Sequence, residues 1–479
     1  MQTETTKENV WGHSLIWFGA AVSIAEIMTG ALLAPLGFRR AVSAILIGHV
    51  IGCALLWGAG WIGARHRLCA MDSAKLSFGT RGGRFFAVLN LIQLVGWGTV
   101  MISAGAQSAH GMMPGLPMWG WAVIIGCLLM IWNVLGIKYL NVVNTLAVSG
   151  LFVLSLVLGW IVFRGTGSTA AVSGGLTFGQ GLELSIAMPL SYLPLIADYT
   201  CGTSRPRLVG GMCAAVYFVI SCWMYFLGLC AAMFTGGADV AGIFAGAGLG
   251  VTALLIVVFS AVTSSFLDVY SSGMSVQSLY AKCPPKWTGA VVCVIGVLLA
   301  IWSNTAAFEQ FLYWIGSVFA PMIVVQIADV LFNPEGGAKG LRFGWKNLIL
   351  WGMGFVLYRV LLYFDPPCGS SIPVIIFTAI CCCAVYGISA ILRAGERKKL
   401  LRKVFSFPPA PLIFFQTFLC SLFLFEPCSK RKSGTKVLNN MATMGKSKDI
   451  VLAETGRLKQ STAQRAMLIL WTLPPILLV

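Results

Sequence analysis

Apolar segments long enough to cross a membrane recur along the first 393 residues of the chain. A helix needs about 20 apolar residues to span the hydrocarbon core of a bilayer. Segments of this kind, separated by short polar turns, occupy residues 15–36, 41–62, 85–107, 118–136, 140–163, 178–200, 208–234, 246–272, 288–303, 308–331, 346–364 and 372–393. The pattern therefore predicts an all-α integral membrane protein with about 12 transmembrane helices.

Basic residues in the connecting loops predict the orientation of the spans, because Lys and Arg are retained on the cytoplasmic side. Thirteen of them lie in loops that follow even-numbered spans, whereas loops after odd-numbered spans hold Arg39, Arg40 and Arg164. We therefore expect a multi-pass protein of the cell (inner or plasma) membrane with both termini in the cytoplasm. Residues 1–14 form the cytoplasmic N-terminus and lack the features of a cleaved signal peptide, so the first span is expected to direct insertion.

The first ten spans divide into two sets of five, residues 15–163 and 178–331. The leading span of each set is unusual, since the first carries Glu26 among small residues and the sixth contains Pro189 and Pro194. Proline removes a backbone hydrogen bond and breaks a helix. Interrupted helices at corresponding positions are typical of transporters built on an inverted repeat, with the binding site at the membrane midplane. Residues 346–393 would add two further helices.

Composition agrees with a membrane protein. Residues of the set AVILMFWYC make up 58% of the chain and charged residues 10%, against about 25% charged in soluble domains, which excludes a soluble enzyme. The net charge is +17, but most of the excess lies in the tail, residues 394–479, to which we assign no role. The charge therefore gives no reason to expect a nucleic-acid partner. An apolar stretch near 408–427, interrupted by prolines, would be an interfacial segment or a thirteenth span.

Cysteine and histidine do not form a recognisable metal or disulfide pattern. The 15 cysteines contain no CxxC pair, and the four histidines form no HExxH motif. We interpret the cysteines as small apolar helix residues. The sequence predicts no cofactor, and no bound metal beyond a coupling Na⁺.

Charged side chains within membrane spans are costly and are candidates for function. Glu26 lies in the middle of the first span, where an interrupted helix could direct it into a central cavity. A carboxyl group can pair with a ring nitrogen and an exocyclic amine together, as in an aminopyrimidine. The alternative is a structural carboxyl that hydrogen-bonds a neighbouring helix.

The eighth span is the most polar. Ser260, Thr263 and Ser264 share one helical face by their i, i+3, i+4 spacing. Hydroxyl oxygens, together with carbonyl groups of an unwound first helix, are ligands that suit Na⁺, although Ser and Thr also form ordinary hydrogen bonds between membrane helices. Asp268 follows one turn later and could gate, couple a proton or bind substrate, or instead form an internal salt bridge or hydrogen bond.

Trp97 stands between two glycines near the middle of the third span. Glycine on each side leaves the indole faces open, which suits stacking on a flat heterocycle; packing is the alternative. Asp198 ends the sixth span, where a role in cytoplasmic gating competes with a structural role at the helix end.

Four short motifs stand out within the predicted spans: Gly96-Trp97-Gly98, Ala197-Asp198-Tyr199-Thr200, Thr263-Ser264-Ser265 and Tyr270-Ser271-Ser272-Gly273. Together they resemble the nucleobase:cation symporter 1 family, also called the purine/cytosine permease family. The resemblance covers residues 15–393 and is closest to the branch of hydroxymethylpyrimidine transporters, which is associated with salvage of thiamine precursors.

The resemblance implies a leucine-transporter-type 5+5 inverted repeat plus two extra helices, working by alternating access. It implies that Trp97 stacks on the substrate ring. Met101 and Ser265 occupy places where the family often has Gln and Asn, so the hydrogen-bonding amides are missing. Glu26 or Asp268 could supply polar partners instead.

Two further assignments rest on the same resemblance. Tyr192 is the candidate for the second aromatic residue of the site, on the sixth span. A cation would be bound by Ser260, Thr263 and Ser264, with backbone carbonyl groups from Ala21 and Ile24.

We therefore expect a secondary active transporter in the lipid bilayer that imports a pyrimidine or nucleobase-like ring by symport with Na⁺ or H⁺. Hydroxymethylpyrimidine is the first substrate to consider, and cytosine or another purine, pyrimidine or allantoin-like ring is the alternative. An amino-acid transporter of the same fold is disfavoured by Glu26. An intramembrane enzyme would need a clustered His or paired-carboxylate site, and a channel is disfavoured by the interrupted helices. The oligomeric state is left open.

Overall fold

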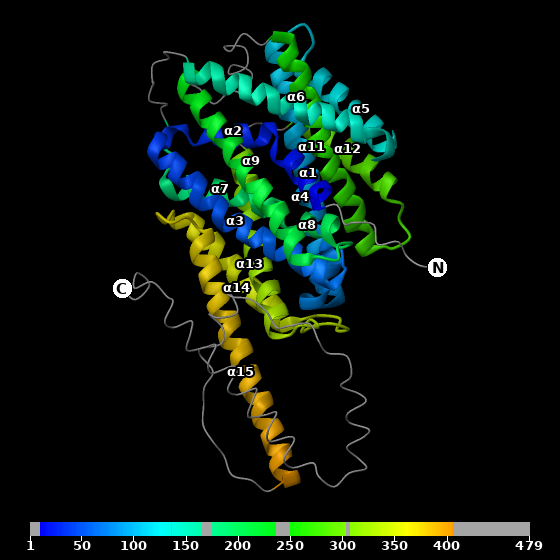
Figure 1. Ribbon diagram of the computed structural model, residues 1–479, viewed down its shortest axis with the longest axis vertical. Coiled ribbons are helices and arrows are strands. Elements are labelled where there is room, and N and C mark those ends of the chain that lie inside the picture. Colours follow the sequence, from blue (N-terminus) through cyan, green and yellow to red (C-terminus); the bar gives the residue numbers. More distant parts are fainter. Residues whose placement is uncertain (1–9, 136, 165–173, 236–249, 303–306, 406–479) are drawn as a thin grey trace. The chain divides into compact units, whose positions relative to one another are not determined.

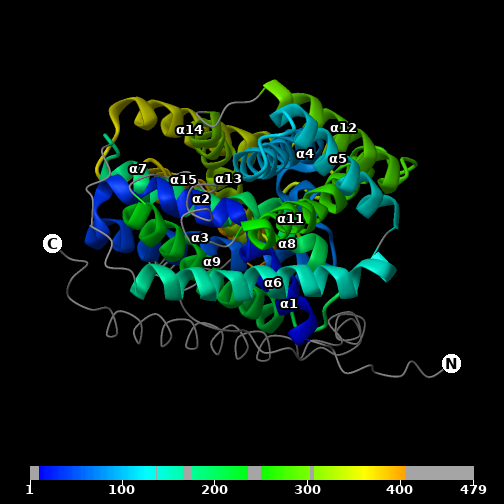
Figure 2. The ribbon, with the colours of Figure 1, turned by 90° about the horizontal axis from the view of Figure 1, so that it is seen from above.

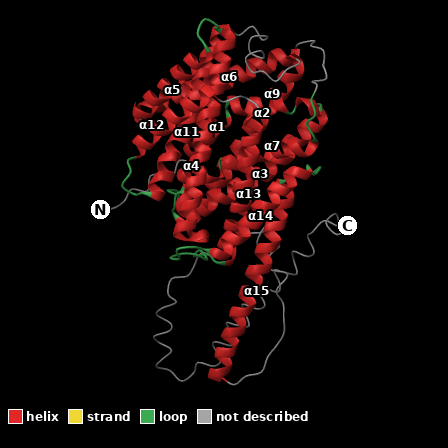
Figure 3. Ribbon diagram, turned by 180° about the vertical axis from the view of Figure 1, so that it is seen from behind, coloured by secondary structure: helices red, strands yellow, loops and turns green. Residues whose placement is uncertain are grey.

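The computed structural model describes residues 10–135, 137–164, 174–235, 250–302 and 307–405, and every regular element in these ranges is helical (Figures 1 and 3). The elements of the first half are α1 (Val10–Ala21), α2 (Ile24–Leu32), the 3₁₀ helix η1 (Ala34–Leu36), α3 (Phe38–His66), α4 (Ala70–Met112), α5 (Met118–Leu135) and α6 (Ile137–Arg164). Those that follow are α7 (Phe178–Ser191), α8 (Leu193–Thr200), α9 (Pro206–Thr235), α11 (Gly250–Leu279), α12 (Pro285–Trp302), α13 (Ala307–Phe332), α14 (Trp345–Phe364) and α15 (Ser371–Phe405).

In its described residues each predicted span lies on a single helix, except 178–200, which covers α7 and α8, and 15–36, which covers α1, α2 and η1. Six helices are long and apolar enough by themselves to cross a membrane, and the bent pair α1–α2 is a seventh candidate among the described residues. The described parts of α5, α6 and α12 contain apolar stretches that are shorter than this length. The all-α prediction is confirmed, whereas the apolar stretch near 408–427 and the rest of the tail lie outside the described residues.

The first predicted span is broken, as its small and polar residues suggested. The segments Gly12–Ala21 and Ile24–Leu36 meet at an angle of 47°. Ser23 has an extended backbone (φ −137°, ψ 148°), and its side chain accepts a hydrogen bond from the Ala25 amide. The serine therefore caps the first turn of α2, which provides a partner for an amide that the break would leave unpaired.

The sixth predicted span is also divided into two helices. Pro189 lies inside the last turn of α7, Tyr192 is the connecting residue, and Pro194 lies in the first turn of α8. Proline is well tolerated in a first turn, where the missing amide hydrogen has no helical partner in any case. The two breaks lie next to each other, because the Tyr192 hydroxyl is 3.4 Å from the carbonyl oxygen of Ala20.

The broken helices pack mainly on α9 and α3 (Figures 1 and 2). The segments α1 and α2 contact α9, whereas α7 and α8 contact α3; α13 also packs against α7, and α4 contacts α2 and α8. The helices α2 and α9 approach most closely at two glycines. A Cβ on Gly30 of α2 would lie 2.1 Å from the Tyr225 carbonyl oxygen, and a Cβ on Gly228 of α9 would lie 2.0 Å from the Ile27 carbonyl oxygen. Small residues are the usual means by which membrane helices pack closely. All these helices belong to one compact unit that includes residues up to Cys382.

Candidate functional site

Three aromatic side chains surround the meeting point of the two helix breaks. Trp17 of α1, Tyr192 and Tyr217 of α9 contact one another edge to face, with ring centroids 5.2–6.1 Å apart. Trp17 is buried and its indole nitrogen has no hydrogen-bond partner within the described structure. Aromatic rings with unused polar atoms are common components of sites for small heterocycles.

Glu26 is fully buried and belongs to a chain of hydrogen bonds that joins α2, α9 and α3. Tyr217 donates to Oε1 of Glu26 at 2.6 Å, and the Ser221 hydroxyl lies 2.8 Å from its Oε2. His49 of α3 completes the chain, with Nε2 2.7 Å from the Ser221 oxygen and Nδ1 2.9 Å from the Ile45 carbonyl oxygen. The Glu26 side chain is therefore tied to a neighbouring helix.

The partners in this chain of hydrogen bonds restrict where its hydrogens can lie. The Ile45 carbonyl can only accept, so Nδ1 of His49 carries a hydrogen. Ser221 has a single hydrogen to share between Glu26 and His49. Either the carboxyl group is protonated and the imidazole neutral, or the carboxylate and the imidazolium are both charged. The two arrangements have the same total charge and differ only in the position of one proton.

One face of α4 presents Gln93, Trp97 and Met101 at intervals of four residues, all of them buried. The Gln93 amide nitrogen donates to the Ser191 carbonyl oxygen at 2.6 Å, at the end of α7. Its side-chain oxygen and the Trp97 indole nitrogen are buried without a partner in the described structure. This face therefore offers one unused acceptor and one unused donor next to a helix break.

The two glycines beside Trp97 have different surroundings. A Cβ on Gly96 would lie 2.4 Å from the Phe311 ring, whereas one on Gly98 would meet nothing within 4 Å. The Trp97 ring contacts Phe308 and Phe311 of α13 edge to face, with centroids 6.1 and 5.5 Å apart. Gly96 thus allows α13 to pack against α4, whereas Gly98 lies beside Gly296 of α12, where a Cβ on Gly296 would be 3.6 Å from the Gly98 carbonyl carbon.

On α11, Asp268 and Ser265 are buried. Ser265 donates to the Ala261 carbonyl of its own helix at 2.7 Å, so its oxygen is left to accept. Asp268 is close enough to Tyr192 for the two to interact electrostatically. The side chains of Ser260, Thr263 and Ser264 lie outside the described part of α11.

The two residues expected to offer carbonyl groups to a cation flank the break of the first span. Ala21 ends α1 and Ile24 begins α2. The Ala21 carbonyl accepts from the Ser23 amide at 2.9 Å, which leaves its second lone pair unused.

Asp198 is buried at the end of α8, where its Oδ1 accepts from the Ala70 amide at 2.9 Å. A carboxylate at the first turn of α4 satisfies an unpaired amide and favours the helix dipole. Next to it, the sulfur atoms of Cys69 and Cys201 are 3.7 Å apart. The end of the second broken helix is therefore joined to the start of α4.

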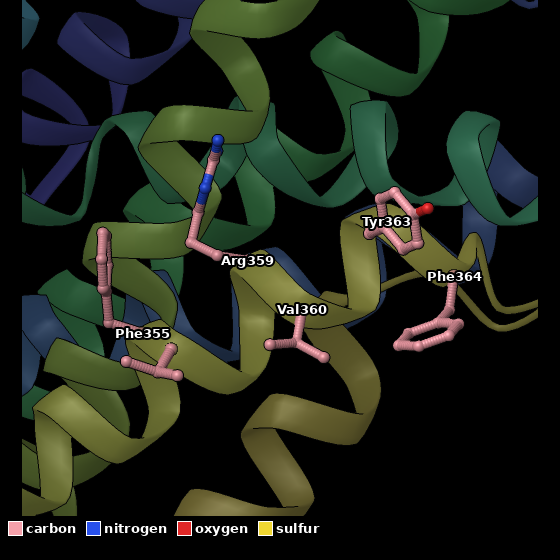
Figure 4. A pocket seen from close by; sticks show the side chains of 6 residues that line it. Phe355, Arg359, Val360, Tyr363 and Phe364 are labelled. Carbon is pink, nitrogen blue, oxygen red and sulfur yellow. The ribbon is translucent and has the colours of Figure 1, made fainter.

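A shallow surface pocket of about 390 Å³ is formed by one stretch of α14 alone, Phe355, Val356, Arg359, Val360, Tyr363 and Phe364 (Figure 4). Val356, Val360, Tyr363 and Phe364 are exposed, with Tyr363 at 86%, whereas Phe355 is partly buried. An apolar helix face of this kind suits contact with lipid. The pocket contains none of the residues at the helix breaks.

The sequence prediction missed Gln93, His49, Ser221 and Tyr217. Gln93 could have been found, because it is a polar residue inside a span and lies one helical turn before Trp97. The other three become relevant only through their contacts with Glu26, which depend on how α2, α3 and α9 pack.

Sequence comparison relates the chain to known permeases. The sequence pattern of a family described as permeases for cytosine/purines, uracil, thiamine and allantoin matches residues 1–343. The cytosine permease of Escherichia coli strain K12 is 24% identical over 339 residues, which cover 69% of this chain and 80% of that protein. A vitamin B6 transporter of Saccharomyces cerevisiae is 23% identical over 359 residues, covering 66% and 62% of the two chains.

Solved transporter structures share the fold. Mhp1, a nucleobase-cation-symport-1 family transporter with bromovinylhydantoin bound, superposes with a TM-score of 0.66 at 16% identity, over 78% of this chain and 91% of Mhp1. A Na⁺-coupled sialic acid symporter in an outward-open state gives a TM-score of 0.57 at 13% identity, over 80% of this chain and 89% of the symporter. The helical arrangement described above is thus that of a multi-pass membrane transporter.

Proposed function

The chain belongs to the family of permeases for cytosine/purines, uracil, thiamine and allantoin, and on this premise we propose that it imports a pyrimidine or similar ring by symport with Na⁺ or H⁺. Hydroxymethylpyrimidine, a thiamine precursor, is the first substrate we propose. Cytosine or another purine, pyrimidine or allantoin-like ring is the alternative, consistent with relatives named for transport of cytosine and vitamin B6.

The proposal rests on one observation: the two helix breaks meet next to the face of α4 that carries Gln93 and Trp97. Tyr192 links the breaks through the Ala20 carbonyl, and Gln93 links α4 to the second break. Aromatic rings and unpaired polar atoms lie together there. In the proposed complex the substrate ring stacks on Trp97, with Tyr192, Met101 and Ser265 around it.

Asp268 and Glu26 are the acidic side chains proposed for this site. Asp268 is buried on α11 within electrostatic range of Tyr192, and we propose that it reaches the ring. Glu26 accepts from Tyr217, whose ring packs on Tyr192. Its proposed contribution is therefore to set the position of the aromatic cluster and to accept a substrate amine when Tyr217 moves.

The proposed cation site lies between the first break and α11. Carbonyl groups of Ala21 and Ile24 would bind the ion together with Ser260, Thr263 and Ser264. The sialic acid symporter of the same fold is Na⁺-coupled, so Na⁺ is the first ion to test. Coupling follows if the cation stabilises the state that binds substrate, because each ligand then raises the affinity for the other.

We propose for the transporter the same division into segments that the sequence predicts. Residues 15–163 and 178–331 would form the two inverted repeats, residues 346–393 two additional helices, and residues 1–14 and the basic tail, 394–479, the cytoplasmic ends. Opposite topology of the two repeats places the broken helices α1–α2 and α7–α8 at equivalent positions.

Uptake into proteoliposomes tests the proposal. Labelled hydroxymethylpyrimidine is supplied with cytosine as competitor, and Na⁺ and pH gradients are imposed separately. Concentrative uptake under one gradient is expected, and it identifies the coupling ion. Failure to take up either ring, by protein with intact helical structure, would show that the proposed substrate class is wrong.

A further inference from the structure

Gln93 combines complete burial with an unused hydrogen-bonding atom. It is 0% exposed, and its side-chain oxygen has no partner in the described structure. Leaving a buried polar atom without a partner destabilises the fold, so such atoms are uncommon and call for an explanation. Gln93 lies beside the second helix break and one turn from Trp97, which places this acceptor at the proposed substrate site.

The orientation of the Gln93 amide is fixed by the fold. The Ser191 carbonyl can only accept, so the end of the amide that lies 2.6 Å from it must be the NH₂ group. Turning the amide over would bring two oxygen atoms together at that distance. The side-chain oxygen is therefore held in one position by the end of α7, without loss of side-chain freedom when a ligand binds.

Among the neighbours proposed around the ring, Met101 has no hydrogen-bonding group of comparable strength. Ser265 donates to the Ala261 carbonyl of its own helix and keeps an oxygen that can accept, but among the described residues no other helix holds that oxygen in place. Two amide oxygens on α4 are buried and unused in the described structure, those of Asn90 and Gln93, and Gln93 is the one linked to the helix break and one turn from Trp97. An aminopyrimidine offers the complementary donor, its exocyclic amine.

We propose that Gln93 determines substrate specificity by accepting a hydrogen bond from an exocyclic amino group of the substrate ring. The inference rests on the proposed function and adds to it the chemical class of the ring, one that carries an amine. The amine supplies the hydrogen that the buried oxygen lacks. A ring with hydrogen in place of the amine leaves the oxygen unpaired.

A pair of matched ligands tests the inference. Cytosine and 2-pyrimidinone differ by the 4-amino group, and hydroxymethylpyrimidine is compared in the same way with its 4-deamino analogue. Each ring competes for uptake into proteoliposomes that hold the full-length protein. The wild-type protein is expected to prefer the amino ring about tenfold, as one buried hydrogen bond allows.

The variant Gln93→Met has a similar shape without the acceptor. It is expected to lose the preference for the amino ring while the affinity for 2-pyrimidinone stays the same. Asn90→Leu is the matched control, because Asn90 is also buried on α4 with an unpaired oxygen but donates to Ser275 of α11, not to the helix break. Its preference ratio should equal that of the wild type.

The outcomes separate the two proposals. If the wild-type protein takes up none of these rings, the proposed function is wrong. If it transports them and Gln93→Met weakens amino and deamino rings equally, or leaves the ratio unchanged, then Gln93 only supports the helix break and the inference is overturned. If Gln93→Met does not reach the membrane, Gln93→Asn replaces it, and the shorter amide must lower the ratio for the inference to stand.

Discussion

At the scale of single residues, the surroundings of a side chain decide what its chemistry can be used for. Glu26 and Glu183 are both buried glutamates on broken helices, yet they have different partners. Glu26 lies in a chain with Ser221 and His49 in which one proton has two possible positions. Glu183 accepts hydrogen bonds from four groups near the start of α15. The proton at Glu26 can therefore move, whereas the Glu183 carboxyl group has all its acceptor sites in use and fixes α7 to α14 and α15.

Trp97→Ala tests the residue that the sequence motif singled out. Loss of ring stacking is expected to raise the apparent KM for uptake about tenfold, because base stacking on an aromatic side chain contributes about 1–3 kcal/mol. Initial rates are measured at increasing substrate concentration, with membrane expression determined in parallel. Trp97→Phe is the control and should retain most of the affinity. Unchanged uptake kinetics in Trp97→Ala would remove the stacking role.

At the scale of helices, two polar contacts connect the second broken helix to its neighbours at opposite ends. Glu183 of α7 accepts from the Ser370 and Ser371 amides at 2.9 and 2.7 Å, and from the hydroxyl groups of Ser371 and Tyr358. Asp198 of α8 accepts from the Ala70 amide. In both cases a carboxylate satisfies the first amides of a helix that the sequence places far away.

Glu183→Ala is expected to destabilise the protein, because it leaves two amides and two hydroxyl groups without their acceptor. The loss should be about 3 kcal/mol or more, seen as a lower Tm of the purified protein in detergent. Glu335→Ala is the control, since Glu335 forms an exposed pair with Lys339 at 3.2 Å and such pairs contribute about 1 kcal/mol or less. Equal Tm values for the two variants would contradict the anchoring role of Glu183.

Cys69 and Cys201 permit a test of movement at the other end of the same broken helix. Their sulfur atoms are 3.7 Å apart, and a small shift brings them to the bonding distance of a disulfide. The thiol oxidant diamide removes the two hydrogens as the disulfide forms. Uptake should then stop and return with dithiothreitol, because α8 can no longer separate from the start of α4 during alternating access.

Cys69→Ser and Cys201→Ser are the controls for this cross-link, and each should make uptake insensitive to diamide. Mass spectrometry measures the fraction of cross-linked protein. Full activity in a sample that is completely cross-linked would show that these two helix ends do not separate during transport.

At the scale of the whole molecule, the proposed coupling depends on two helices that are far apart in the chain, α1–α2 with its break and α11. Both α1 and α2 contact α11, and in the proposed cation site the Ala21 and Ile24 carbonyl groups would share the ion with hydroxyl groups of α11. Because binding linkage is reciprocal, any group that binds the cation must also change the affinity for the substrate.

The double substitution Thr263→Ala and Ser264→Ala tests this coupling. It is expected to raise the cation concentration needed for half-maximal uptake and, at a fixed cation concentration that no longer saturates the site, to weaken substrate binding. Ser43→Ala is the control, because Ser43 is exposed on α3 and donates to the Arg39 carbonyl of its own helix. A double variant with the cation dependence of the wild type would remove the ion site from α11.

The sequence alone determined the helices and which two predicted spans are broken. Long apolar segments specify membrane helices because an unpaired backbone group is costly in lipid, and the prolines near Tyr192 and the small residues near Ser23 prevent a regular helix there. It also singled out Trp97, since a tryptophan between two glycines in the middle of a span is unusual. The role of that residue remains a prediction until transport is measured.

Only the tertiary structure decided which side chains meet. Tyr217 and Ser221 are 191 and 195 residues from Glu26 in sequence, and Ser191 is 98 residues from Gln93. Hydropathy states which face of a helix avoids lipid but not which helix covers that face. The partners are selected by close packing at small residues such as Gly30 and Gly228, where backbones approach within reach of polar side chains. For this reason the acceptor on Gln93 and the proton chain at Glu26 became visible only in the folded protein.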